Sequence, residues 1–127
     1  MSFNWSDYLT LAKSLAKQES DPLLSDEAYK RTAISRAYYA AFHSALNFAS
    51  SSEGFSPTGR GEDHIRLIRH FQKSTDRPGQ SIGANLNRLR DNRRRADYDN
   101  IVRKLDKLTR KALRTADNIL FTLSSLR

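Results

Sequence analysis

The sequence predicts an all-α fold: an antiparallel bundle of four to five helices, in a single domain that spans residues 1–127. Apolar residues recur at helical spacing along most of the chain. The chain contains only five glycines and three prolines, too few for the many tight turns of an all-β domain. A length of 127 residues suits one domain with one hydrophobic core.

Two helices are expected in the first half of the chain. The first begins at Asn4 or Ser6, either of which is a suitable cap, and ends at Asp21-Pro22. Its buried face is formed by Trp5, Tyr8, Leu9, Ala12, Leu15 and Ala16. The second helix is expected over residues 26–49. Its many alanines allow neighbouring helices to approach closely, so we expect it at the centre of the bundle.

A loop is expected over residues 50–61, where serine, glycine and proline are concentrated. A third helix follows this loop and ends near residues 77–79 (Arg-Pro-Gly). Its inward side chains are expected to be Ile65, Ile68 and either Leu67 or Phe71. The fourth helix is expected to begin near Ser81 and to continue into the arginine-rich residues 90–95.

The last helix is predicted from the most regular apolar stripe in the chain. We expect a break at Asp97-Tyr98-Asp99, because Asp99 can cap a following helix. After it, apolar residues lie three or four positions apart, as one buried helical face requires. They are Ile101, Leu105, Leu108, Ala112, Ala116, Ile119 and Leu123.

The net charge of +8 is concentrated in one segment. Residues 88–114 contain eleven basic and four acidic side chains, a net of +7, whereas residues 1–87 carry a net of +1. Such a patch indicates a surface for a polyanion, with RNA as the expected partner. A solvated face without a ligand is the alternative. The predicted RNA-binding residues are Arg88, Arg90, Arg94, Arg95, Arg103 and Lys107.

Several kinds of site are excluded or disfavoured. The chain has no cysteine, so disulfides, thiolate metal sites and cysteine nucleophiles are impossible. Its three histidines have no spacing suited to a metal, and we expect no metal and no cofactor. No stretch reads as a signal peptide or a membrane span, so we expect a cytoplasmic protein with no membrane partner.

Two segments of the chain carry a distinctive pattern. They are Ser35–Leu46, which reads SRAYYAAFHSAL, and Leu89–Asp99, which reads LRDNRRRADYD. Together they resemble the HEPN superfamily. Small stand-alone prokaryotic members carry an SRxYYAxFH helix and an ADYD turn. The resemblance covers most of the chain. It implies a helical bundle that forms a homodimer and brings two R-x4-6-H motifs into a shared cleft. In active relatives this cleft cuts RNA without a metal.

The resemblance assigns the candidate catalytic residues. Arg93 aligns with the motif arginine, and Tyr98 stands at the position of the histidine. Arg93 would bind a phosphate, and Tyr98 would orient it or move a proton, provided that a break at Asp97 lets the two side chains converge. Possible supporting residues are Tyr39, His43, His64 and Asp97. Structural roles stay open for all of them, such as an Arg93–Asp97 ion pair or a packing role for Tyr98.

Two functions follow from these observations. The first is an RNA-binding HEPN-like domain, with or without metal-independent endoribonuclease activity, that acts as a toxin or in phage defence. The second is a non-enzymatic helical partner of another protein, such as a nucleotidyltransferase or an antitoxin. The arginine-dense surface favours RNA over a neutral protein partner, and the tyrosine at position 98 favours binding over catalysis.

Overall fold

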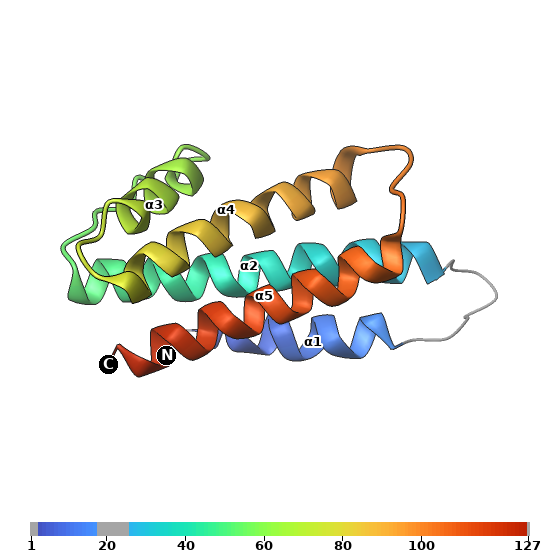
Figure 1. Cartoon of the computed structure of the whole chain (residues 1–127), viewed down its shortest axis with the longest axis horizontal. Helices are drawn as coiled ribbons and strands as arrows, with labels where there is room; N and C mark the ends of the chain where they lie inside the picture. The colour runs from blue at the N-terminus through green and yellow to red at the C-terminus, as the bar shows by residue number, and fades with distance from the viewer. Residues whose placement is uncertain (1–2, 18–25, 127) are drawn as a thin grey trace.

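The all-α prediction is confirmed. The computed structural model describes residues 3–17 and 26–126, and within these ranges the chain forms five α-helices and no strand (Figure 1). Their bounds are α1 Ser6–Ala16, α2 Asp26–Ser52, α3 Asp63–Gln72, α4 Arg77–Tyr98 and α5 Leu105–Ser125. None of the helices in these ranges is both long and apolar enough to cross a membrane.

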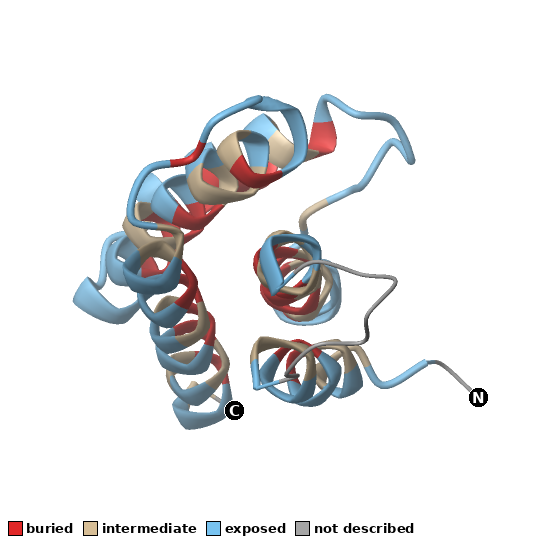
Figure 2. Ribbon diagram, turned by 90° about the vertical axis from the view of Figure 1, so that its right-hand side faces the viewer, coloured by how far each residue is buried: buried red, intermediate tan, exposed pale blue. Residues whose placement is uncertain are grey.

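Helix α2 lies at the centre, as its alanine content predicts, and contacts each of the other four helices. Its inward face is built largely from small side chains that are fully buried, so the neighbouring backbones can approach closely. They are Ala33, Ala37, Ala40, Ala41, Ala45 and Ala49. Viewed along the bundle, the buried residues of every helix face this centre and the exposed residues face outward (Figure 2).

The ends of α1 and α2 differ slightly from the expectation. Asn4 accepts hydrogen bonds from the backbone N–H of Ser6 at 3.1 Å and from its hydroxyl at 2.7 Å, so Asn4 caps α1. The expected end of this helix at Asp21-Pro22 lies outside the described residues. Helix α2 runs three residues beyond position 49, and within this last turn the Ser51 hydroxyl donates to the carbonyl of Asn47.

The boundary between α3 and α4 corrects a sequence prediction. Residues 77–79 do not end α3; they form the first turn of α4. Asp76 caps this turn, because its Oδ1 accepts the backbone N–H of Gly79 at 2.7 Å. Pro78 fits the same turn, since the first N–H groups of a helix have no carbonyl partner within it. In α3, Leu67, Ile68 and Phe71 are buried as expected, whereas Ile65 is exposed.

The expected break after α4 is present, but it begins at Asp99 and not at Asp97. Helix α4 continues without interruption to Tyr98, and α5 begins at Leu105 rather than after Asp99. Lys104 precedes α5 in the left-handed conformation with φ of 53°. Ile101 therefore lies outside the helical stripe and is 80% exposed, while Val102 is buried in this connection.

Candidate nucleic-acid interface

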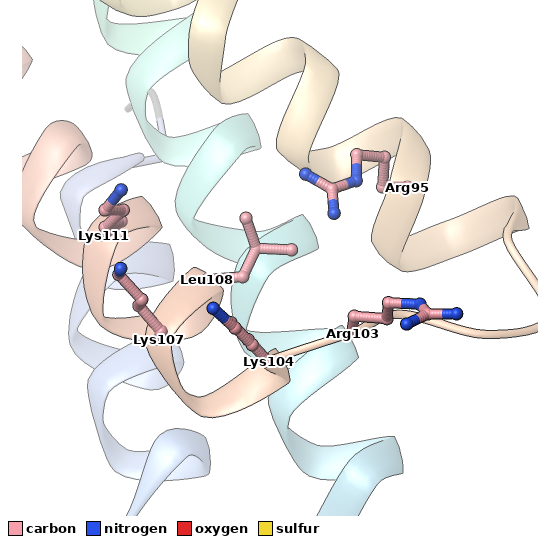
Figure 3. Close-up of a pocket in the computed structure, with 6 residues that line it drawn as sticks. All are labelled: Arg95, Arg103, Lys104, Lys107, Leu108 and Lys111. Atoms are coloured by element: carbon pink, nitrogen blue, oxygen red, sulfur yellow. The ribbon is translucent and has the colours of Figure 1, made fainter.

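Five basic side chains surround a hollow of about 220 Å³ between the end of α4 and the start of α5, which we call the basic groove (Figure 3). Its floor is the partly buried side chain of Leu108. Helix α4 contributes one cation, the connection two and α5 two. These cations are Arg95, Arg103, Lys104, Lys107 and Lys111.

The positive charge of the basic groove is not neutralised within the protein. No acidic residue lines it, and none of its five cations forms an ion pair with any residue in the described ranges 3–17 and 26–126. The nearest acid along the chain, Asp106, is paired with Lys30 of α2 instead. Figure 3 also shows the Arg103 guanidinium pointing away from the lysine amino groups, so the charge is spread over a broad surface. Such a surface attracts a polyanion.

Two cations of the groove, Lys104 and Lys111, were missed by the sequence interpretation. The spacing carried the signal for Lys111, which lies four residues after Lys107 in α5, whereas Lys104 precedes the helix. Positions three and four apart share one face of a helix.

The other predicted RNA-binding residues form a separate group. Arg88, Arg90 and Arg94 line a hollow of about 320 Å³ on α4 with Asn87 and Asp91. The six predicted residues thus divide between this group and the basic groove, which receives Arg95, Arg103 and Lys107.

A third hollow, of about 350 Å³, lies at the end of α4 beside the groove. We call it the Tyr98 hollow, because the Tyr98 side chain lines it and is 74% exposed. Its other lining residues are Asp91, Arg94, Arg95 and Asp99. Arg95 belongs both to this hollow and to the basic groove, so the two are contiguous.

Within one chain, the structure does not bring the two candidate catalytic residues together. Arg93 and Tyr98 lie five positions apart on an unbroken helix, so their side chains point about 140° apart. The Arg93 side chain is 11% exposed and its Nη1 lies 3.5 Å from Asp97 Oδ2. Its guanidinium also lies over the ring of Tyr38, 5.3 Å from the centroid. The expected convergence is therefore wrong for a single chain, and an Arg93–Asp97 pair is present.

The supporting residues Tyr39, His43 and His64 do lie together. They line a pocket of about 270 Å³ between α2 and the start of α3, which neither Arg93 nor Tyr98 lines. His64 stacks on Phe42 with a centroid distance of 4.1 Å. His43 stacks on Trp5 at 3.7 Å, which accounts for its partial burial. These contacts place the histidines in the packed wall of the bundle.

His64 is held in its neutral form. Its Nδ1 lies 2.5 Å from the Tyr38 hydroxyl, and the two groups share a hydrogen bond. Burial, together with the nearby charges of Arg93 and Arg90, lowers the pKa of His64 to about 4. Burial also raises the pKa of Tyr38, so the phenol stays protonated.

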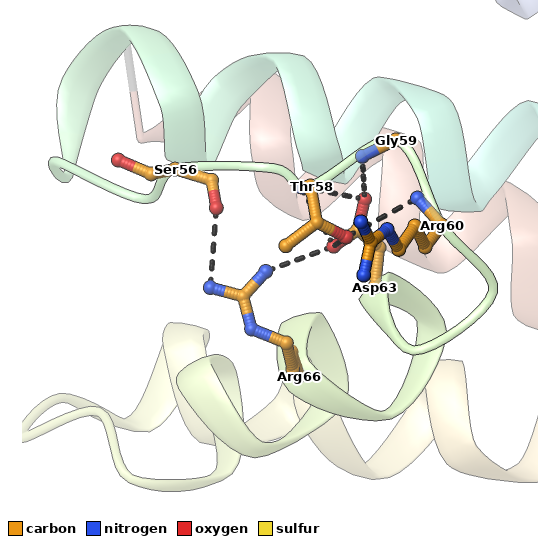
Figure 4. A network of polar contacts seen from close by, with 6 residues as sticks. All are labelled: Ser56, Thr58, Gly59, Arg60, Asp63 and Arg66. Carbon is orange, nitrogen blue, oxygen red and sulfur yellow. Dashed lines mark hydrogen bonds and ion pairs between the residues drawn. The ribbon is translucent and has the colours of Figure 1, made fainter.

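Asp63 fixes the loop in front of α3 (Figure 4). Its buried carboxylate accepts hydrogen bonds from the backbone and hydroxyl of Thr58 and from the backbone of Gly59, at 2.8–3.0 Å. Arg66 Nη1 lies 2.8 Å from the same carboxylate, and Nη2 donates to the carbonyl of Ser56. The backbone bond from Thr58 is the largest cause that lowers the pKa of Asp63 to about 2. The loop is thus tied to the first turn of α3.

The lowered pKa of His64 predicts a loss of stability in mild acid. The unfolded chain binds a proton at this residue below about pH 6.5, whereas the folded chain binds it only near pH 4. The free energy of unfolding should therefore fall between these two values, by about 1–2 kcal/mol after allowance for solvent screening. Urea unfolding at a series of pH values measures this change.

The variant His64→Gln is the control for this prediction. It keeps a polar partner for Tyr38 but cannot be protonated, so its stability should fall less between pH 6.5 and 4. The pKa of His43 is also lowered by burial, so a smaller fall should remain. Asp63 contributes only at more acidic pH, because its stabilisation is lost as pH falls through about 2. Identical pH profiles for the wild type and His64→Gln would contradict the assignment.

Comparison with known proteins finds no match for this chain. No protein-family model matches the chain, and neither a curated protein nor a solved structure matches it. Among residues 3–17 and 26–126, no three histidine or acidic side chains are grouped so that they could hold a metal ion. The geometry of the basic groove is therefore the basis on which function is inferred.

Proposed function

We propose that this chain binds RNA through the basic groove. The observation that supports this most directly is the gathering of five cations from α4, α5 and their connection around one hollow with no acidic neighbour in its lining. Lysine and arginine side chains in such an arrangement bind successive phosphates of a nucleic acid and release its counterions. The group of Arg88, Arg90 and Arg94 extends the positive surface along α4.

Binding is better supported than cleavage within one protomer. Acid–base catalysis needs its groups within hydrogen-bond reach of the same reacting atoms, and Arg93 and Tyr98 point to different sides of α4. Arg93 is also largely enclosed by Tyr38, Tyr39 and Asp97. A site that joins the two residues would need Arg93 of one protomer and Tyr98 of another, and the homodimer implied by the HEPN resemblance stays a prediction.

The basic groove can be tested with a double substitution. We expect Lys107→Gln with Lys111→Gln to weaken RNA binding and to make its salt dependence shallower. For single-stranded RNA, the slope of log affinity against log salt should decrease by about 1.4, since each lost phosphate contact removes about 0.7. Fluorescence polarisation with a labelled RNA at several salt concentrations measures both quantities.

The matched control is Arg69→Gln with Arg77→Gln. Both arginines are exposed, as the two lysines are, and their substitution removes the same charge. They lie on α3 and at the start of α4, outside the groove. The control should lose little affinity for RNA and keep most of the salt slope, because it reduces only the long-range attraction between the protein and RNA and removes no phosphate contact. Equal losses in both double variants would show that net charge alone drives binding. No RNA binding by the wild type would favour the second hypothesis, a helical partner for another protein.

A further inference from the structure

We propose that the Tyr98 hollow binds one unpaired RNA base that carries an exocyclic amino group, such as cytosine or adenine, while phosphates of the same strand lie in the basic groove. This inference rests on the proposed function and adds the class of RNA, a single strand, and a base preference. It also gives Tyr98 a role in stacking in place of the catalytic role expected from the sequence.

The first support is the contrast in charge between two contiguous hollows. The basic groove has five cations and no acid in its lining, whereas the Tyr98 hollow has two arginines and two aspartates. A phosphate is attracted to the groove but is repelled by the carboxylates of Asp91 and Asp99. An uncharged base has no such conflict. The charge pattern therefore separates a phosphate site from a base site.

The second support is the exposure of the Tyr98 ring. A large aromatic side chain that is 74% exposed contributes little to the core. The ring stacks on no other aromatic side chain of the described residues, and its faces are open to a ligand. Exposed aromatic rings beside a cationic groove are the means by which proteins hold single-stranded nucleic acids, because an unpaired base can stack on them.

The third support is the pair of free acceptors beside the ring. Within the described part of the chain, the carboxylates of Asp91 and Asp99 accept no hydrogen bond and form no ion pair. A carboxylate accepts from the amino group of cytosine, and adenine presents an amino group of the same kind. Uracil presents a carbonyl oxygen at the corresponding position, which a carboxylate repels. In a duplex one hydrogen of each amino group is already paired, and the base is stacked between its neighbours and so cannot stack on Tyr98.

The fourth support is continuity and rigidity. Arg95 lines both hollows, so a phosphate bound to it leaves the attached nucleotide next to Tyr98. The backbone at Asp99 is held in place, because its carbonyl accepts a hydrogen bond from Arg31 Nη1 at 2.5 Å. The Asp99 carboxylate is thus attached to an anchored backbone, so less of the chain must be ordered on binding.

The test compares short RNA homopolymers of equal length by fluorescence polarisation, with oligo(C), oligo(A), oligo(U) and a duplex as probes. We expect the wild type to bind oligo(C) and oligo(A) about five- to tenfold more tightly than oligo(U) and the duplex. Asp99→Asn should remove most of this preference, because an amide can donate to the uracil carbonyl. Tyr98→Leu should weaken binding of all single strands about fivefold, and Tyr98→Phe should retain it.

Each outcome either supports or overturns the inference. Equal affinity for oligo(C) and oligo(U), with a salt slope that still depends on Lys107 and Lys111, would overturn the base site and leave the basic groove standing. A Tyr98→Leu variant that binds like the wild type would overturn stacking. If the wild type bound none of these RNAs, the proposed function itself would be overturned. These positions are exposed, so melting curves should confirm that every variant folds.

Discussion

Replacing Arg31 with alanine should lower the free energy of unfolding by about 2–4 kcal/mol and weaken RNA binding about tenfold. The Arg31 side chain is only 18% exposed and lies outside the basic groove. Its guanidinium donates to the carbonyls of Ala96 at 3.0 Å, Asp99 at 2.5 Å and Asn100 at 3.2 Å. Ala96 lies in the last turn of α4, where carbonyls have no partner within the helix, and the other two carbonyls follow the helix. Loss of the three bonds is therefore costly.

The weaker RNA binding should arise because Arg31 holds the connection between α4 and α5 in place. Without these bonds the residues after α4 lose their anchor, and Arg103 and Lys104 no longer keep their places in the basic groove. The salt slope of binding should therefore become shallower, although Arg31 itself lines none of the groove. Urea unfolding and RNA titration at several salt concentrations measure the two effects.

Two further variants separate position from charge. Arg31→Lys keeps the charge but cannot reach three carbonyls with a planar fork, so it should rescue only part of the loss. Arg36→Ala removes another cation of α2, which lies over the Tyr8 ring and is not a donor to the three carbonyls that Arg31 binds. It should leave the salt slope unchanged. An Arg31→Ala protein that is less stable but binds RNA like the wild type would show that the connection does not position the groove.

Replacing Gly83 with alanine should destabilise the protein by about 1–3 kcal/mol. Inside a helix this change normally stabilises by about 0.5–1 kcal/mol, because alanine has the higher helix propensity. Gly83 lies inside α4, where a Cβ would come within 2.6 Å of the Gln72 backbone nitrogen and 3.0 Å of the Phe71 carbonyl carbon. Backbone atoms cannot move aside as a flexible side chain can, so α3 and α4 would have to separate.

Gly61→Ala is the matched control. A Cβ at Gly61 meets no atom within 4 Å, so this substitution should leave the stability nearly unchanged. Urea unfolding of both variants beside the wild type is the measurement. If Gly83→Ala proved as stable as the wild type or more so, the contact between α3 and α4 would be looser than the structure describes.

The helices were predictable because each depends on a local pattern. The central position of α2 follows from its alanines, and the stripe of α5 follows from spacing that any window of the sequence contains. The start of α4 was missed although its signal is local, with Asp76 as cap and Pro78 in the first turn. A capping rule applied at that point finds it.

The start of α5 could not be found in this way. Asp99 is a good helix cap by type, and the sequence therefore favours a helix that begins directly after it. In the fold its carbonyl is bound by Arg31, a residue 68 positions away in the sequence, and α5 starts only at Leu105. The consequence for the candidate site is direct. Arg93 and Tyr98 share an unbroken helix, and the pair expected to converge is separated.

The turn at Lys104 places the N-terminus of α5 at the basic groove, where the backbone itself adds positive potential. A helix acts as a dipole with about half a positive charge at its N-terminus, where backbone N–H groups are unpaired, and half a negative charge at its C-terminus. Helix α5 begins at the basic groove, and Arg31 binds a carbonyl in the last turn of α4, that of Ala96. Part of the groove's attraction for anions is therefore a property of the backbone. It should persist at any pH, and after any substitution of the lysines, for as long as α5 remains helical.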